Sequence, residues 1–171
     1  LEGLFGAVEN VTTTKELMDK KTLADLKIKC IVLKHPSIRE RMTYAEELQY
    51  LVANEKRNRF ISDLLLHLNG NTLCLFQLVE KHGKILYSQV NDVAKDRKVF
   101  FVYGKTGADT REDIRSIVEN EKNSIIIASY GTFSTGINIR NLHNIVFASP
   151  SKSKIRVLQS IGRGLRRSST K

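Results

Sequence analysis

Three polar side chains near the carboxyl terminus have the types and the spacing that suit phosphate chemistry. On a helix, Gln159, Arg163 and Arg166 fall on one line, spaced by four and by three residues. Two guanidinium groups placed in this way suit a cluster of oxyanions such as a triphosphate, because arginine presents a planar fork of donors and is always charged. An apolar stripe occupies nearly the opposite side of the helix: Ile155, Leu158, Ile161 and Leu165. The alternative is a basic amphipathic helix whose charged face is simply solvated.

The charge of the chain points to a polyanionic partner. The 171 residues include 28 Lys and Arg against 18 Asp and Glu, a formal net charge of +10, so nucleic acid is the first partner to consider. A membrane is disfavoured, because no apolar run approaches the ~20 residues of a spanning helix and no signal-peptide pattern is present. Cys30 and Cys74 lie in apolar stretches, which predicts buried, reduced thiols in a cytoplasmic protein. No His stands at metal-ligand spacing with a Cys, so no metal site is predicted.

The elements that must position these residues follow an alternating pattern from residue 72 onward. Apolar runs without alternation are separated by helical segments, which indicates a parallel sheet covered on both faces. A helix is predicted over 79–91, and another is capped by Asp109 and Glu112, with Ile114, Ile117 and Val118 as its inner face. The predicted strands are 72–76, 99–103, 124–129 and 144–148.

The part of the chain before residue 72 is predicted to hold one strand and two helices. The apolar run 28–33 is a strand candidate. Thr43 and Glu46 have the spacing of a capping box and open a helix that runs to about Ala53. A second helix stops at Gly70-Asn71. Its apolar face consists of Phe60, Ile61, Leu64, Leu65 and Leu68.

Small and polar segments follow the predicted strands, where ligands bind in parallel α/β sheets. Gly104-Lys105-Thr106 ends like a phosphate-binding P-loop, but that loop also requires glycine five residues before Gly104, and Val99 stands there. A P-loop at this site, and with it a P-loop kinase, is therefore rejected. Two interpretations stay open: the glycines shape a turn, or Lys105 and Thr106 grip a nucleic-acid phosphate.

The segment from Ser129 to Asn138 is predicted to be a small, polar loop. Its hydroxyl groups on Ser129, Ser134 and Thr135 have the size and chemistry to donate to phosphate, and Asn138 to hydrogen-bond a ribose. The alternative is an ordinary connection in which Gly136 supplies a positive φ.

These segments together resemble the second motor domain of superfamily 2 helicases. The last motif of that family reads Gln/His-x-x-Gly-Arg-x-x-Arg, and Gln159-Ser-Ile-Gly-Arg-Gly-Leu-Arg166 fits it. The family's preceding motif resembles Ser129 through Asn138, and 102–111 looks like a further segment of the same domain. Similarity to phage recombination helicases of this superfamily extends over most of the chain.

The resemblance implies a RecA-like, three-layer α/β domain with a mainly parallel sheet and no P-loop of its own. It implies that Arg163 and Arg166 reach the γ-phosphate of ATP held by another motor domain, that Gln159 couples this site to the rest of the motif, and that Gly136 and Asn138 lie near the ribose. The implied nucleic-acid groove is lined by Lys105, Thr106, Arg111, Ser129, Ser134 and Thr135.

The resemblance also predicts the organisation and the partners. Residues 1–27 would link from a preceding first motor domain, and 28–171 would form a helicase C-terminal domain truncated at its end. ATP and Mg²⁺ would be bound mainly by the first motor domain, because the chain contains neither GxxxxGKS/T nor an Asp-Glu-x-His/Asp box.

The implied partner is DNA, branched or single-stranded, with RNA–DNA hybrids possible. The implied location is a host cytoplasm if the protein is phage-encoded. The isolated chain is predicted to lack ATPase activity. The competing hypothesis is a non-enzymatic, basic α/β module that binds nucleic acid.

Overall fold

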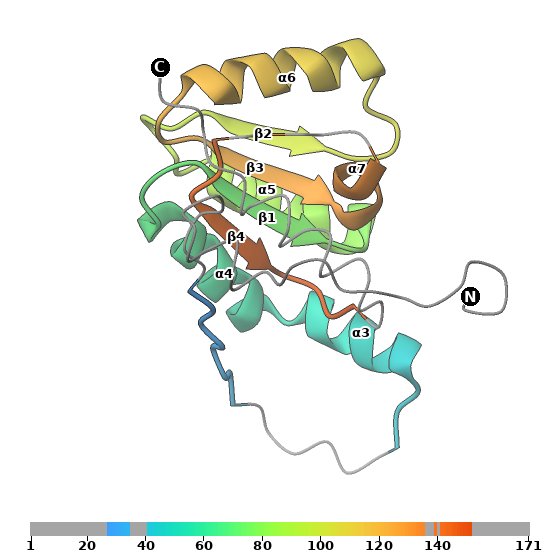
Figure 1. Cartoon of the computed structure of the whole chain (residues 1–171). Coiled ribbons are helices and arrows are strands. Elements are labelled where there is room, and N and C mark those ends of the chain that lie inside the picture. Colours follow the sequence, from blue (N-terminus) through green and yellow to red (C-terminus); the bar gives the residue numbers. More distant parts are fainter. Residues whose placement is uncertain (1–26, 35–40, 136–138, 140, 152–171) are drawn as a thin grey trace, which may run out of the picture.

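A single parallel sheet organises the computed structural model, which describes residues 27–34, 41–135, 139 and 141–151. The strand order along the sheet is β2-β3-β1-β4, and every described pair is parallel (Figure 1). This confirms the predicted α/β class. The strands are β1 (Thr72–Phe76), β2 (Val99–Val102), β3 (Ile125–Ser129) and β4 (Asn144–Phe147), each within one residue or so of its predicted bounds.

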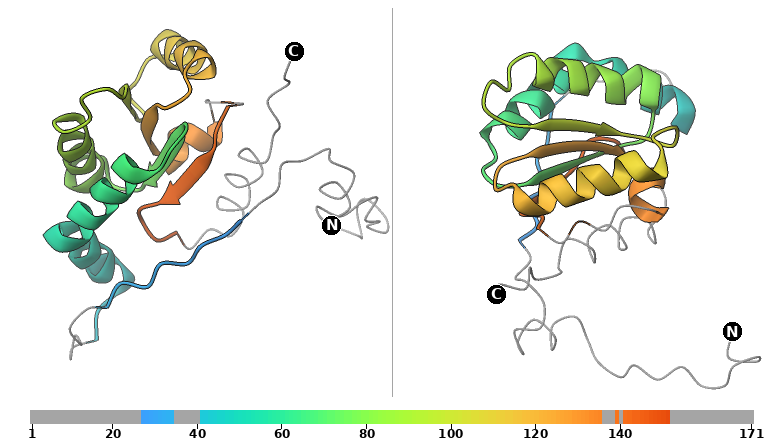
Figure 2. Two further views of the ribbon diagram at one scale, coloured as in Figure 1. Left: turned by 90° about the vertical axis from the view of Figure 1, so that its left-hand side faces the viewer. Right: turned by 90° about the horizontal axis from the view of Figure 1, so that it is seen from above.

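Helices cover both faces of the sheet, so the domain has three layers (Figure 2). On one face the core contains residues of α4 and α5, and on the other it contains residues of α6 and α7. The helical elements are α3 (Tyr44–Ala53), α4 (Glu55–His67), the π-helix η1 (Val79–Gly83), α5 (Lys84–Asn91), α6 (Ala108–Asn120) and α7 (Tyr130–Thr135).

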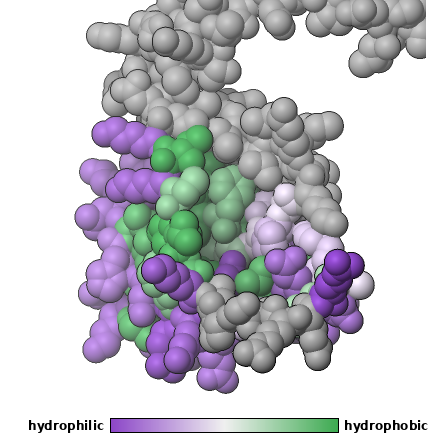
Figure 3. Space-filling model, turned by 90° about the horizontal axis from the view of Figure 1, so that it is seen from below, coloured by the Kyte–Doolittle hydropathy of each residue, from purple (hydrophilic) through white to green (hydrophobic). Residues whose placement is uncertain are grey.

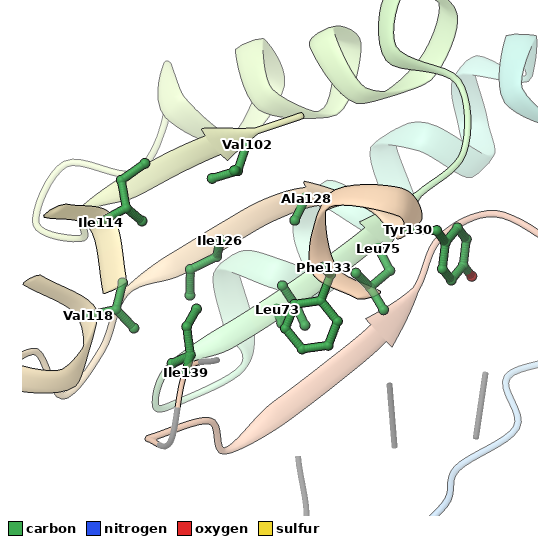
Figure 4. Packing of buried hydrophobic residues seen from close by; sticks show 10 residues of the cluster. All are labelled: Leu73, Leu75, Val102, Ile114, Val118, Ile126, Ala128, Tyr130, Phe133 and Ile139. Carbon is green, nitrogen blue, oxygen red and sulfur yellow. The ribbon is translucent and has the colours of Figure 1, made fainter. Parts of the chain in front are cut away.

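The strands are apolar at successive positions because neighbouring residues of a strand pack into the cores on opposite faces of the sheet. In β1, Leu73 packs with Phe133 of α7 and Val118 of α6 (Figure 4). Its neighbour Cys74 packs on the other face with Leu65 of α4. All residues of β1 and β3 are buried. The prediction of a buried Cys74 is confirmed.

The two helices before β1 are joined by one residue with two roles. The capping box at α3 is confirmed: the Thr43 hydroxyl accepts from the Glu46 amide, and the Glu46 carboxylate accepts from the Thr43 amide at 2.7 Å. Asn54 ends α3, and its side chain then accepts from the amide of Arg57 at 2.9 Å to begin α4. Because of this cap, α4 starts earlier in the chain than its apolar face indicated.

The predicted strand over 28–33 is wrong. Residues 27–34 are extended but pair with no described strand, and Ile28, Ile31 and Val32 are 71%, 53% and 84% exposed. Cys30, predicted buried, is exposed as well. An apolar run predicts β-structure only where a neighbouring strand accepts its hydrogen bonds, and none of the described strands does so here.

Three details of the predicted helix faces are also wrong. Phe60 and Ile117 are 38% and 40% exposed, because the sheet-facing stripe of each helix is narrower than its apolar residues suggest. Asp109 does not cap α6: the N-cap position is Gly107, without a side-chain hydrogen bond, and Asp109 lies in the first turn. A carboxylate in the first turn still complements the helix dipole.

Candidate functional site at the carboxyl edge of the sheet

Parallel pairing brings the predicted site segments to one edge. The carboxyl ends of parallel strands lie together, so the segments that follow β2, β3, β1 and β4 are neighbours in the order of the sheet. These segments are the turn 103–107, helix α7, Gln77 and the residues from Ala148 onward. The edge predicted from the strand ends is therefore a real spatial grouping.

The turn after β2 is closed by its own hydrogen bonds. The Thr106 amide donates to the Tyr103 carbonyl at 2.9 Å, and the Tyr103 amide donates to the Thr106 hydroxyl at 3.1 Å. Nε of Arg111 donates to the Thr106 carbonyl at 2.9 Å. This geometry agrees with the interpretation that the segment shapes a turn and not a P-loop, whose backbone amides must point at phosphates. Lys105 is exposed at the tip of the turn, with no hydrogen bond or ion pair to other residues in the described part of the chain.

The segment after β3 begins as a helix, so the predicted loop from Ser129 is wrong over 130–135. The Ser129 hydroxyl lies 2.7 Å from the Thr132 hydroxyl and accepts from the Thr132 amide at 3.4 Å, as an N-capping side chain does. Tyr130 and Phe133 are 2% and 0% exposed and anchor α7 in the core (Figure 4). Serine as an N-cap, followed by two buried aromatics at helical spacing, explains why this polar stretch forms a helix.

Three consecutive residues after β4, named the junction (Ala148, Ser149 and Pro150), receive hydrogen bonds from around the site. Arg57 of α4 donates through Nη2 to the Ala148 carbonyl. The Tyr130 hydroxyl donates to the Ser149 carbonyl at 2.7 Å. Figure 4 shows Tyr130 beside the chain that leaves β4. The Tyr44 hydroxyl of α3 donates to the Pro150 carbonyl at 3.4 Å.

The Ser149 side chain completes this network. Its hydroxyl accepts from the Gln77 amide at 3.2 Å and lies 3.0 Å from Nδ1 of His82. Within the described part of the protein, Nε2 of His82 and Nη1 of Arg57 are buried without a hydrogen-bond partner.

Burial sets the protonation of this cluster. Burial, together with the nearby Arg57 guanidinium, lowers the pKa of His82 to about 4, so the ring is neutral at physiological pH. Burial also lowers the pKa of Arg57, and it raises the pKa of the Cys74 thiol to about 12, which makes that thiol unreactive. The cluster is thus a charged donor and a neutral imidazole suited to holding backbone and hydroxyl groups in place, not to proton transfer near neutral pH.

The π-helix η1 places His82 in this cluster. The amides of His82 and Gly83 both donate to the Leu78 carbonyl, at 3.2 and 2.9 Å, which widens the turn to five residues. Gly83 is required by the close approach that results, since a Cβ there would lie 2.5 Å from the Phe76 ring.

Four residues of this cluster were not among the site residues predicted from the sequence: Arg57, His82, Tyr130 and Ser149. Arg57 does carry a local signal, because it falls on the helical stripe of Ile61 and Leu65 at intervals of four residues. A cation on a buried stripe indicates a specific acceptor in the fold. No local pattern marks His82, whose burial depends on the π-turn.

Several predicted site residues cannot be placed. Gly136, Asn138, Gln159, Arg163 and Arg166 lie outside the described residues, and so do the side chains of Ser134 and Thr135. In the described ranges, no group of three His, Cys, Asp or Glu side chains is placed to hold a metal ion. No helix in those ranges is long and apolar enough to cross a membrane.

Comparison with known proteins decides the family of this parallel-sheet domain. The profile of the family described as "Helicase conserved C-terminal domain" matches residues 55–168, which include the whole sheet and its carboxyl edge. The chain belongs to this family. The helicase C-terminal domain thus contains both the junction and the Gln159–Arg166 motif.

This helicase domain is also similar to a known helicase and to a solved structure. It is 38% identical over 176 residues to the ATP-dependent DNA helicase UvsW of enterobacteria phage T4, covering 99% of this chain and 34% of the relative. It superimposes on the crystal structure of T4 UvsW with a TM-score of 0.62 and 40% identity, over 71% of this chain and 25% of that one. The chain therefore spans about a third of the length of this relative. The predicted resemblance to a helicase C-terminal domain and to a phage helicase is confirmed.

Proposed function

We propose that this chain acts as the second motor domain of an ATP-dependent DNA helicase that unwinds or branch-migrates recombination and replication intermediates. The observation that carries the proposal is the coincidence of the family match with the geometry of the sheet. The carboxyl edge of the sheet gathers the turn 103–107, α7 and the junction, and the chain continues from the junction toward Gln159, Arg163 and Arg166.

In this mechanism Arg163 and Arg166 stabilise the negative charge that develops on the γ-phosphate of ATP, as arginine fingers do. Gln159 couples them to the rest of the domain, and Gly136 and Asn138 lie near the ribose. Mg²⁺ and the β-phosphate are held by a first motor domain, because this chain lacks the P-loop sequence and the Tyr103 and Thr106 amides are bonded within the turn after β2.

Nucleic acid is proposed to bind along the carboxyl edge. Lys105 supplies an exposed cation there, and the Arg111 guanidinium is oriented by the carbonyl of Thr106. The Ser129 and Thr106 hydroxyls already have partners within the protein, so their part is to shape the backbone that faces the strand. The α7 residues Ser134 and Thr135 complete the proposed contacts.

A first motor domain is the proposed partner within the same protein, and the apolar surface supports this. Ile28, Ile31 and Val32 are exposed on the extended segment 27–34, and a neighbouring domain would remove them from water. Figure 3 shows apolar side chains gathered between hydrophilic ones on the lower face of the molecule. The host cytoplasm is the proposed location, in keeping with the phage relative.

The decisive experiment is steady-state ATP hydrolysis by the intact helicase carrying Arg163→Ala or Arg166→Ala. We expect kcat to fall by about a hundredfold or more while nucleotide affinity changes little. Wild-type turnover in both variants contradicts the proposal. The competing hypothesis, a basic module that binds nucleic acid without hydrolysis, predicts that Arg163→Ala only weakens DNA binding and makes its salt dependence shallower.

A further inference from the structure

The junction is held by side chains from three different helices. Its three carbonyls accept from Arg57 of α4, from Tyr130 of α7 and from Tyr44 of α3. The first two bonds involve buried or half-buried groups, since Tyr130 is 2% exposed and Ala148 is 1% exposed.

These contacts join the two proposed halves of the site. Tyr130 is the first residue of α7, directly after the capping Ser129 and within the segment proposed to meet nucleic acid. The junction is followed in the chain by the segment that carries the two arginines. The Tyr130–Ser149 bond is therefore a direct link from the nucleic-acid side to the start of the arginine segment.

We propose that Tyr130 and Arg57 are positioning residues of the motor. Arg57 anchors the junction to α4, and Tyr130 ties it to α7. The position of α7 therefore determines where the segment that carries Arg163 and Arg166 begins. This inference rests on the proposed function. Its physical basis is that a buried donor is costly to leave without an acceptor, so the junction moves with α7 and not independently of it.

Rigidity of α7 makes the link effective. Phe133 is fully buried against β1 and β3, and Tyr130 also stacks on Phe147 with ring centroids 6.3 Å apart. A contact made on α7 is thus transmitted through a packed element and one hydrogen bond, without a flexible loop between them.

The first test uses this chain itself and hydrogen–deuterium exchange. The Ala148 amide donates to the Leu75 carbonyl at 2.9 Å and reports how firmly the junction is held. In Tyr130→Phe and in Arg57→Lys we expect this amide to exchange at least about fivefold faster, while amides in the middle of β3 keep their protection. Unchanged protection of Ala148 in both variants overturns the proposal.

The second test measures DNA-stimulated ATP hydrolysis by the intact helicase. Tyr130→Phe removes one hydroxyl, and Arg57→Lys keeps the charge but loses the planar fork. We expect each to lower kcat about tenfold, with the KM for ATP and the DNA affinity changed less than about twofold. Tyr87→Phe is the matched control, because Tyr87 packs against Phe101 on the other face of the sheet, and it should behave as wild type.

The outcomes separate the two proposals. If Arg163→Ala and Arg166→Ala lower kcat and Tyr130→Phe and Arg57→Lys do not, the positioning role is wrong and the proposed function stands. If the arginine variants leave kcat unchanged, the proposed function is wrong, and the exchange of Ala148 still decides whether the junction is held as inferred. If Tyr130→Phe does not fold, Arg57→Lys carries both measurements, and wild-type behaviour in it contradicts the proposal.

Discussion

Asn71, just before β1, and Ser124, just before β3, are joined by two hydrogen bonds to one oxygen. Oδ1 of Asn71 accepts from the Ser124 amide at 2.8 Å and from its hydroxyl at 2.9 Å. Nδ2 of the same side chain donates to three carbonyls, those of Val118, Glu121 and Asn141. Asn71 is fully buried, so this one amide holds the amino edge of the sheet, opposite the carboxyl edge.

Asn71→Ala should therefore destabilise the fold strongly. It leaves the Ser124 amide and three carbonyls with fewer partners in a buried place, and we expect the free energy of unfolding to fall by about 3 kcal/mol or more. Urea denaturation measures this change. Asn120→Ala is the matched control, because the exposed Asn120 amide donates to the Ser116 carbonyl of its own helix, and it should cost under about 1 kcal/mol. Equal losses for the two variants would contradict the role of Asn71.

Arg97 has a comparable role at the end of α4. Its guanidinium donates to the carbonyls of Leu65 and Leu66, and also to those of Gly70 and Asn123. Arg97→Lys retains the charge but loses the fork, and thermal unfolding should show a loss of about 2 kcal/mol.

Arg115→Lys is the control for Arg97. Arg115 pairs with Glu112 and Glu119 on the surface of α6, where ion pairs contribute little, and its replacement should change stability by less than about 0.5 kcal/mol. A larger effect at Arg115 than at Arg97 would show that surface charge, and not capping of α4, dominates.

His82 should make stability depend on pH. The pKa of His82 is about 4 in the folded protein against 6.5 ordinarily, so the unfolded chain takes up a proton first as pH falls. The contribution of the neutral ring is complete above about pH 6.5 and is lost as pH falls toward 4, by up to roughly 3 kcal/mol. Urea unfolding between pH 7.5 and 4.5, compared with His82→Gln, measures it: the variant should have the flatter pH dependence. Parallel curves would refute this assignment.

Gly83→Ala should be costly for a steric reason. The new methyl group would lie 2.5 Å from the Phe76 ring, so η1 or the ring must move within a packed core, at a cost of about 1–3 kcal/mol. Gly104→Ala is the control, because a Cβ at Gly104 meets nothing within 4 Å. Its melting temperature should stay within a few degrees of wild type, and a tolerated Gly83→Ala would mean that Phe76 is free to shift.

Lys105→Ala tests the proposed nucleic-acid edge. Lys105 is exposed at the carboxyl edge, whereas Lys122 is exposed just before β3, at the amino edge. If DNA follows the carboxyl edge, Lys105→Ala weakens binding and lowers the salt slope by about 1, and Lys122→Ala does neither. Fluorescence anisotropy with single-stranded DNA at several salt concentrations measures both. Equal effects would indicate diffuse electrostatic binding.

Local sequence patterns by themselves determined much of this protein. Non-alternating apolar runs required a sheet buried on both faces, Thr43 and Glu46 set the start of α3, and the polar strand ends marked the carboxyl edge as the candidate site. Each of these depends on residues close in sequence, where periodicity and capping act directly.

Tertiary structure decided what depends on partners far along the chain. The run 28–33 has the composition of a strand but no described strand beside it. The polar stretch after Ser129 forms a helix because Tyr130 and Phe133 are buried in the core. Arg57 and Ala148 are separated by 91 positions, so their hydrogen bond exists only once the sheet has closed. Burial and long-range hydrogen bonds are properties of the assembled fold, which is why no local pattern shows which side chains hold the junction.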